Sequence, residues 1–544
     1  MAPFVYKDFE HYKDERAALI NRDRSPSLRP DFAQVLSEIE TKADEVVRKI
    51  RTAEAASIWG AKYSDIVHPF PGMEFLTGRS IILKTKIFDI LTKARAAMSS
   101  ACALLHVHLD ATLNPKLLLE FGLEEPAMHV CVSERLTSAN IFTTLPEFRA
   151  LPKDDWVLAN STCGLTDKDY VPNTWVQIRK ARDTFDTSMG GPECFDQWVE
   201  RALSISSTEA YRTHNTVAKV EYFSTLKFQG LVLFTPIWRK YIREFLRSSV
   251  EDQISYIEVR VVFAPEYMVG EDGAQDVPHR EWLLIFDQVQ KELKAKLERQ
   301  GREDDFVGAR IIYTALRFIP IDELEWHFQD CIALKKEFPH LIAGFDIAGP
   351  EDNLPPLSHY AEALLRFREQ QKEALVDIPL ILHAGETCGD GTFADMNLFD
   401  AILLGSERIG HGFSLVKHPK LMEICKERGI LIEMCPISNE VLRPTASMPM
   451  HPLPILMNNG IPLAISSDDP GIFGNTGLSF DMYQVLVSSE VTGLTALREL
   501  ARNSLKYSTL EREDKKRALE SWERRWEIFV QGIVDTFVDA NHAV

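Results

Sequence analysis

The sequence has few cysteines, no long apolar run and no excess of cationic residues. Its eight cysteines among 544 residues include no CxxC pair, so we expect mostly reduced thiols rather than a disulfide scaffold. Nowhere do about 18 apolar residues follow one another, and the first twenty residues lack the apolar core of a signal peptide. These absences predict a cytoplasmic protein without a membrane segment.

The charge balance excludes another class of function. Lys and Arg total 61 against 80 Asp and Glu, which gives a net charge of −19. A field of this sign repels polyanions, so we expect no nucleic-acid partner. With 45% hydrophobic residues, the chain can nevertheless bury a large core.

Short apolar, β-rich runs recur along the chain with helical stretches between them, as in parallel sheets covered by helices. Eight such units predict an α/β fold of the closed (β/α)8 TIM-barrel type, with its active site at the carboxyl ends of the strands. An open doubly wound sheet is the alternative. The predicted strands are Cys102–His108, Tyr256–Phe263, Ala309–Thr314, Leu341–Ile347, Ile378–His383, Arg408–Phe413, Ile430–Met434 and Ile461–Ser466.

The spacing of these strands predicts the organisation of the chain. The first two strands start 154 residues apart, whereas the later ones start 22 to 53 residues apart. We therefore expect a long insertion, at about 115–225, within a barrel spanning 98–500. Residues 1–97 show helical periodicity and predict an N-terminal extension that could serve dimerisation, and 501–544 predict C-terminal helices with charged faces.

Polar side chains at the strand ends predict a metal site. His106 and His108 stand two apart in LLHVHLD, so both side chains point to the same side. His383 ends the fifth strand in LHAGET, and Asp468 follows the eighth in ISSDDP. Three imidazoles and one carboxylate suit a catalytic zinc that keeps a position open for water. Neither HExxH nor HxE…PCxxC is present, which excludes those two classes of zinc enzyme.

Three further residues are expected near these ligands. Glu386, three residues after His383, is placed to act as a general acid if burial keeps it protonated. His411, between glycines in RIGHGF, could orient or deprotonate a water. Asp469 stands beside Asp468 and is free to contact a substrate.

The motifs LLHVHLDA, GFDIAGPED, HAGET, NLFDAILLGSERIGHGFSL, MCPISN and ISSDDPGIFG resemble the adenosine/AMP deaminase superfamily, and within it the adenosine deaminase-related growth factor branch. The match in type and order covers about Leu104 to Tyr483. The resemblance implies one zinc per chain, held by His106, His108, His383 and Asp468, and hydrolytic removal of the 6-amino group of adenosine-type substrates. It also implies that Glu386 protonates N1, that His411 holds or deprotonates the attacking water, that Asp469 contacts N7 and that the Gly349 backbone N–H meets N3.

Several alternatives stay open at this stage. The insertion contains Trp175, Arg179, Lys180 and Arg182, which could cover a sugar or hold a phosphate, although an ordinary helix surface explains them as well. Adenine nucleotides (AMP, ADP or ATP) therefore remain possible substrates beside adenosine. An amidohydrolase that opens cyclic amides and a non-catalytic binding protein are the remaining alternatives, and a homodimer is expected. Growth-factor members are secreted and carry a disulfide in the insertion, whereas no signal peptide is visible here, so Cys131, Cys163 and Cys194 need not pair.

Overall fold

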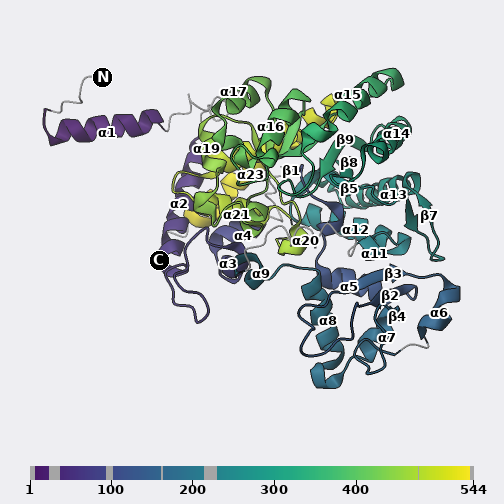
Figure 1. The fold of residues 1–544 in the computed structure, drawn as a ribbon. Coiled ribbons are helices and arrows are strands. Elements are labelled where there is room, and N and C mark those ends of the chain that lie inside the picture. Colours follow the sequence, from purple (N-terminus) through teal and green to yellow (C-terminus); the bar gives the residue numbers. More distant parts are fainter. Residues whose placement is uncertain are drawn as a thin grey trace.

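The computed structural model describes residues 7–23, 37–93, 102–160, 163–212, 229–475 and 477–538. A parallel eight-stranded barrel surrounded by helices lies at its centre (Figure 1). Two four-stranded arcs, β1-β5-β8-β9 and β10-β11-β12-β13, are joined by parallel bridges between Phe345 and Leu380 and between Val107 and Asp468. The barrel is therefore closed, and the predicted fold class is confirmed.

Each of the eight predicted strands overlaps an observed one, because each is an apolar run buried on both faces. The strands are β1 (Cys102–Leu104), β5 (Ile254–Val262), β8 (Gly308–Leu316), β9 (Ile342–Ala348), β10 (Ile381–Ala384), β11 (Arg408–His411), β12 (Leu431–Met434) and β13 (Leu463–Ile465).

Amphipathic helices cover the outside of the barrel, each burying one apolar stripe against the strands. In the first of them, Trp238, Tyr241, Ile242 and Phe245 form such a stripe. The surrounding helices are α12 (Thr235–Glu251), α13 (His279–Glu298), α14 (Ile321–Glu337), α15 (Leu357–Ala374), α16 (Phe393–Leu403), α17 (Pro419–Arg428), α19 (Leu453–Asn458) and α22 (Leu494–Lys506). Shorter elements at the strand ends are β6 (Tyr267–Val269), β7 (Gln275–Pro278), α18 (Pro436–Val441), α20 (Pro470–Phe473) and α21 (Ser479–Val487).

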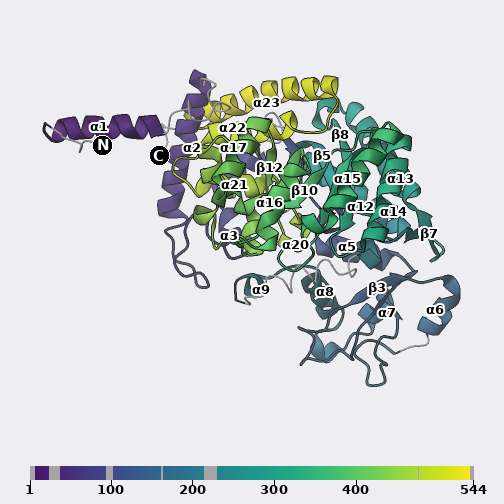
Figure 2. The same cartoon turned by 45° about the horizontal axis from the view of Figure 1, so that its top comes forward.

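The long first crossover forms a body of its own beside the barrel (Figures 1 and 2). A three-stranded antiparallel sheet of order β3-β2-β4, which the sequence did not predict, lies within this insertion. Residues 213–228, which include the predicted end of the insertion, lie outside the described ranges. The elements are α5 (Pro115–Glu124), β2 (Met128–Cys131), β3 (Glu147–Ala150), α6 (Lys153–Asn160), β4 (Val176–Gln177), α7 (Ile178–Asp183), α8 (Gly191–Ala202) and α9 (Ser207–Arg212), followed by α11 (Gln229–Val232).

The described part of the N-terminal region forms helices, and most of them pack on the barrel. Arg51 of α2 is buried and donates to the backbone oxygens of Leu486, in the last turn of α21, and of Ser489 and Thr492 after that helix. Of the described N-terminal helices, α1 alone is drawn apart from the rest of the molecule (Figures 1 and 2). The helices are α1 (Phe9–Asp23), α2 (Glu38–Ser57), α3 (Phe75–Ile82) and α4 (Lys86–Lys93).

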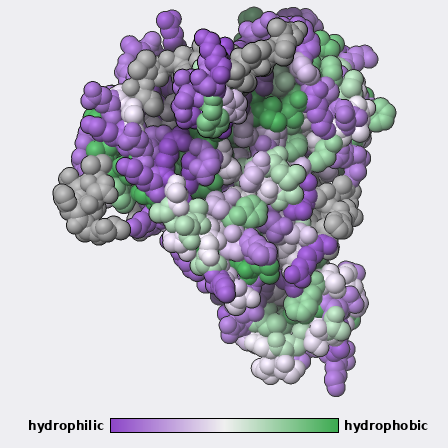
Figure 3. All heavy atoms as spheres, turned by 90° about the vertical axis from the view of Figure 1, so that its left-hand side faces the viewer, coloured by the Kyte–Doolittle hydropathy of each residue, from purple (hydrophilic) through white to green (hydrophobic). Residues whose placement is uncertain are grey.

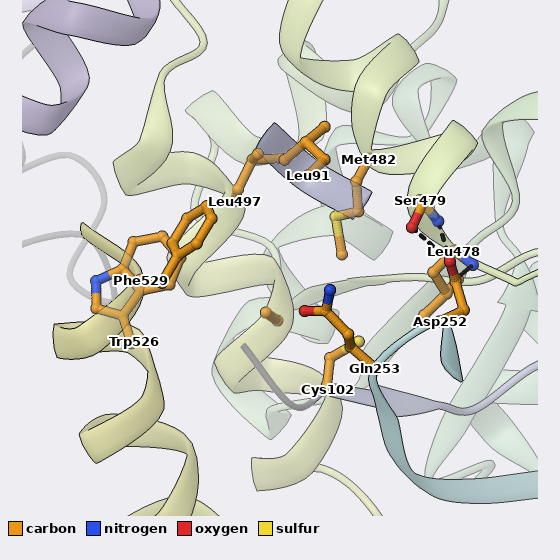
Figure 4. Close-up of a pocket in the computed structure, with 11 residues that line it drawn as sticks. Leu91, Cys102, Asp252, Gln253, Leu478, Ser479, Met482, Leu497, Trp526 and Phe529 are labelled. Carbon is orange, nitrogen blue, oxygen red and sulfur yellow. Dashed lines mark hydrogen bonds between the residues drawn. The ribbon is translucent and has the colours of Figure 1, made fainter. Parts of the chain in front are cut away.

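The C-terminal helix α23 (Arg512–Val538) lies along α2 and covers the amino-terminal end of the barrel. The indole Nε1 of Trp526 donates to Glu40 of α2 at 2.8 Å, and Trp526 also lines a small pocket with Cys102 and Phe529 (Figure 4). At one side of this pocket the Asp252 carboxylate accepts hydrogen bonds from the Leu478 and Ser479 backbone and so caps α21. The pocket therefore belongs to the packing of the strand starts, at the opposite end of β1 from His106 and His108.

All eight cysteines lie in described positions as free thiols. Among the described residues, no helix has the length and apolarity that a membrane crossing requires.

Candidate active site

The predicted site residues come together at the carboxyl ends of four strands. His106 and His108 follow β1, His383 lies in β10, His411 ends β11 and Asp468 follows β13. His411 and Asp468 both have φ of 60°, a left-handed conformation that residues with a side chain seldom adopt. Backbone hydrogen bonds hold Asp468 against the first strand, since its N–H donates to His106 O and its oxygen accepts from His108 N. Strained backbone that neighbouring strands stabilise is typical of functional sites.

Two pairs of the predicted ligand atoms have the spacing that a single tetrahedral ion requires. Oδ1 of Asp468 lies 3.3 Å from Nε2 of His106 and 3.3 Å from Nε2 of His108. Two atoms at about 2.0–2.1 Å from one tetrahedral zinc are about 3.3–3.4 Å apart. The ring of His383 lies against His106, with 4.6 Å between the centroids. The four residues predicted as ligands are therefore adjacent in space.

His411 joins the same cluster, because its ring nitrogens and those of His106 and His383 lie within 4.8 Å of one another and of an Asp468 oxygen. Its Nε2 is 3.9 Å from Oδ2 of Asp468, farther than the two imidazoles that face Oδ1. Oδ2 of Asp468 already has a partner, since Ser438 Oγ donates to it at 2.7 Å. This arrangement leaves Oδ1 for a metal and sets His411 beside the position.

Two buried atoms of this cluster lack hydrogen-bond partners. Nε2 of His106 and Oδ1 of Asp468 are both inaccessible to solvent and unpaired. Burial lowers the pKa of His108, but the Asp468 carboxylate, 3.3 Å away, and the nearby Asp469 carboxylate raise it to about 9. Unpaired buried polar atoms are costly, so the two atoms favour a bound partner at this position, and the surrounding carboxylates favour a positive charge there. The donor set thus fits a divalent cation, and its nitrogen and oxygen atoms are those that zinc accepts.

Two buried carboxylates bind the Nδ1 atoms of His106 and His383, on the side of each ring that faces away from the metal position. The sequence did not predict them. Glu433 of β12 accepts from Nδ1 of His106 at 2.9 Å, and Asp346 of β9 accepts from Nδ1 of His383 at 2.6 Å. Both rings therefore present Nε2 to the metal position. Burial lowers the pKa of His383 to about 3, so the ring is neutral, as a ligand must be.

A buried arginine connects the two carboxylates. Arg260 of β5 is fully buried and donates to Asp346 at 2.7 Å and to Glu433 at 2.8 Å. Arg408 adds a 2.7 Å hydrogen bond to Glu433 and another to Glu258. The sequence carried one signal of this network, since Glu258 and Arg260 alternate inside an otherwise apolar strand, and charges rarely occupy such positions unless paired.

Glu386 lies at the mouth of the barrel with its side chain 19% exposed. Its backbone N–H and that of Gly385 donate to the buried carboxylate of Glu351, which also accepts from Asn397 Nδ2 at 2.6 Å. Burial and the nearby Asp468, Glu351 and Asp469 carboxylates raise the pKa of Glu386 well above its usual value. The raised pKa favours the protonated form of the Glu386 carboxyl, which is the form that a general acid requires.

The other two residues implied as purine contacts lie at the same mouth. Burial and the Asp468 carboxylate raise the pKa of Asp469 well above its usual range, so this carboxyl can donate a hydrogen bond. Gly349 follows β9 with φ of 148°, and a Cβ there would lie 2.8 Å from Leu354 Cδ1. A side chain at this position would collide with its neighbour, so glycine leaves the backbone open to close approach.

The cationic residues predicted for sugar or phosphate binding lie elsewhere. Arg179 and Arg182 belong to α7, which both ribbon views place in the insertion body, away from the strand ends (Figures 1 and 2). Arg182 forms a two-pronged ion pair with Asp196, at 2.7 and 2.9 Å, and Arg179 donates to the backbone oxygens of Leu123 and Glu124 at the end of α5. Trp175 lies under the Arg149 guanidinium, 5.4 Å from the ring centroid. These contacts hold the insertion together.

Comparison with known proteins agrees with this geometry. The adenosine deaminase family model matches residues 208–524. Among curated relatives, adenosine deaminase 2 of Sus scrofa is 31% identical over 95% of this chain and 93% of its own length, and adenosine deaminase 2 of Homo sapiens is 30% identical over 96% and 93%.

Solved structures share the fold at low identity. Arabidopsis ADAL in complex with IMP superposes with a TM-score of 0.52 at 14% identity, covering 81% of this chain and 99% of that one. An amidohydrolase from Burkholderia ambifaria with bound zinc gives a TM-score of 0.51 at 15% identity, covering 83% and 94%. Since the family model matches more than half of the residues and full-length relatives reach about a third identity, the chain belongs to the adenosine deaminase family, in its growth factor branch.

Proposed function

We propose that this protein is a zinc-dependent hydrolase that removes the 6-amino group of adenosine, giving inosine and ammonia. One observation carries the proposal: histidine rings and the Asp468 carboxylate converge beside Glu386, a carboxyl whose raised pKa favours the protonated form. Hydrolytic deamination needs both an activated water and an acid for the ring nitrogen. The curated relatives named adenosine deaminase support adenosine as the substrate.

His106, His108, His383 and Asp468 would hold the zinc, one ion per chain. When bound, zinc lowers the pKa of a water from about 15.7 to about 7 and so supplies a nucleophile at neutral pH. Glu433 and Asp346 orient two of the rings through their Nδ1 atoms. The zinc-bound amidohydrolase of the same fold supports this choice of metal.

The remaining residues act on the purine and on the attacking water. Glu386 delivers its proton to N1 while the water attacks C6, which quenches the charge that develops on the ring. The protonated Asp469 donates to N7, and the backbone of Gly349 donates to N3. His411, whose Nε2 lies 3.9 Å from Oδ2 of Asp468, holds the water in line. Glu351 fixes the backbone of Glu386 and so aims its carboxyl.

Adenine nucleotides remain the second candidate substrate class. The Arabidopsis proteins of the same fold carry IMP or bear the name N6-mAMP deaminase, which supports testing phosphorylated substrates. Against this class stand the net charge of −19 and the ion pair of Arg182 with Asp196, which already neutralises one of the α7 cations.

The deciding experiment offers the zinc-loaded protein adenosine, deoxyadenosine, AMP, ADP and ATP and follows the fall in adenine absorbance together with ammonia release. We expect kcat/KM for adenosine to exceed that for AMP by at least about tenfold. An equal or higher kcat/KM for a nucleotide would identify that nucleotide as the substrate. If none of these compounds released ammonia, the proposal would be refuted.

We also propose a cytoplasmic homodimer. Eight free thiols suit a reducing compartment. Helix α1 exposes Phe9 and Leu19 outside the main body. The face that bears α1 and α2 shows hydrophobic residues as separate patches among hydrophilic ones (Figure 3), so a partner would bury the exposed α1 side chains rather than one broad apolar surface. Light scattering on the full chain and on a form without residues 1–23 tests the dimer, and cell fractionation tests the compartment.

A further inference from the structure

A chain of hydrogen bonds leads from the backbone of α19 to the ring of His411. The Leu453 N–H donates to Nδ1 of His451 at 3.1 Å, and Nε2 of His451 lies 3.1 Å from Oδ1 of Asn439. Nδ2 of Asn439 lies 3.3 Å from Nδ1 of His411. All three side chains are almost completely buried, so water does not compete for these contacts.

The direction of every bond in this chain follows from its first member. A backbone N–H can only donate, so Nδ1 of His451 carries no proton. Burial lowers the pKa of His451 to about 3, which leaves a neutral ring with its single proton on Nε2. That proton must point at an acceptor, which fixes the Asn439 amide with its oxygen toward His451 and its NH2 toward His411.

We infer that His451 and Asn439 are positioning residues that hold His411 as the tautomer protonated on Nε2. The Asn439 amide donates to Nδ1 of His411 at 3.3 Å, and Oε1 of Glu386 lies farther from that nitrogen, at 3.5 Å. With the amide donating to Nδ1, the proton of a neutral ring sits on the opposite nitrogen. That nitrogen faces Asp468 Oδ2, 3.9 Å away, on the side where the ligand atoms converge. His411 therefore offers a hydrogen-bond donor to the attacking oxygen and has no lone pair there to take its proton.

Helix α18, which carries Asn439, is tied both to the metal site and to the insertion. Ser438 binds Asp468, Asn439 binds His411, and the next residue, Glu440, accepts from Tyr211 of α9 at 2.9 Å. Three consecutive residues of α18 thus connect a metal ligand, the water-orienting histidine and the insertion. A small displacement of α18 would move all three contacts together.

The first test replaces the amide with an acceptor of the same shape. In Asn439→Asp the carboxylate accepts from both rings, so His411 must carry its proton on Nδ1 and turn a lone pair toward the attacking oxygen. We expect kcat to fall about 10- to 100-fold with KM for adenosine and zinc content little changed, since residues that orient a site from behind have effects of this size. In 15N-histidine-labelled protein, with and without zinc, the His411 ring signals should show protonation on Nε2 in the wild type and on Nδ1 in the variant.

The second test separates positioning from stability. His451→Phe removes the donor, whereas His451→Gln can still accept from Leu453 N–H and donate to Asn439. We expect the phenylalanine variant to lose kcat and the glutamine variant to recover most of it. His327→Phe is the matched control, because His327 is a buried, neutral histidine on the outer helix α14 and should cost stability without changing kcat.

The inference rests on the proposed role of His411, and one further variant distinguishes the two. If His411→Gln retains kcat, the proposed role of His411 fails. If His411→Gln loses kcat but Asn439→Asp keeps it within twofold, or if wild-type His411 is protonated on Nδ1, the relay is refuted and the proposed function stands.

Discussion

The barrel mouth and the insertion both gather charged side chains, but the two clusters are built differently. At the mouth, Arg260, Asp346 and Glu433 are fully buried and each bonds at least two partners across different strands. In the insertion, Arg182 is 33% exposed and its carboxylate partner, Asp196, lies fourteen residues along the chain. Buried, cross-linked charges orient ligands, whereas exposed local pairs contribute little even to stability.

The largest effect is expected from the metal ligands. His106→Ala or Asp468→Ala should abolish deamination, because a catalytic zinc short of one ligand loses affinity and geometry. Elemental analysis should find about one zinc per chain in the wild type and much less in either variant. Two metals per chain, or full turnover after exhaustive chelation, would contradict the mononuclear site.

The next largest effect belongs to the proton donor. Glu386→Gln keeps the shape of the side chain but removes the transferable proton, so kcat should fall by at least about 10²-fold with zinc content unchanged. Steady-state kinetics on adenosine measure this loss. Asp469→Asn is the companion variant and should raise KM as well as lower kcat. Near wild-type kcat in Glu386→Gln would refute the assignment of the acid.

The carboxylates behind the ligands come third. Glu433→Gln and Asp346→Asn should each lower zinc affinity or activity about 10- to 100-fold, since they orient His106 and His383 without touching the metal. Competition with a zinc chelator measures the affinity. Arg366, whose ion pair with Glu325 lies on the outer surface, offers a control: Arg366→Gln should change neither property.

Glu440 allows a test by pH, away from the ligands. It is 1% exposed, and burial raises its pKa to about 8, although the Phe75 N–H and the Tyr211 hydroxyl both donate to it. A raised pKa means that the folded state favours the protonated carboxyl, so this stabilisation is complete below about pH 4.5 and is lost as the pH rises through about 8. Glu440→Gln should therefore gain at least about 1 kcal/mol of unfolding free energy over wild type between pH 6 and pH 9. Denaturant unfolding at both pH values measures it, with the exposed Glu298→Gln as a control that should show no such change.

The same contrast explains what the sequence could predict. Apolar runs buried on both faces identified all eight strands, and HxH, LHAGET and SSDDP marked the strand ends where His106, His383 and Asp468 converge. The hydrogen-bond partners of those residues were not predicted. Asp346 and Glu433 lie inside strands, where no local sequence pattern marks them, and only the closed barrel brings them next to the ligands. The antiparallel sheet of the insertion escaped for a related reason: its strands have two to four residues, too short for any periodicity.

The smallest effect is expected in the insertion, and it tests the comparison directly. Arg179→Ala and Arg182→Ala remove side chains whose charges already bind Leu123 O, Glu124 O and Asp196. The ratio of kcat/KM for AMP to that for adenosine should stay within about twofold of wild type, and an exposed pair such as Arg182 with Asp196 should cost less than about 1 kcal/mol of stability. Steady-state kinetics on both substrates, beside denaturant unfolding, measure the two quantities. A selective rise in KM for AMP would show that α7 contacts the substrate phosphate. A side chain that serves only the internal packing of the insertion cannot distinguish two substrates that differ by a phosphate.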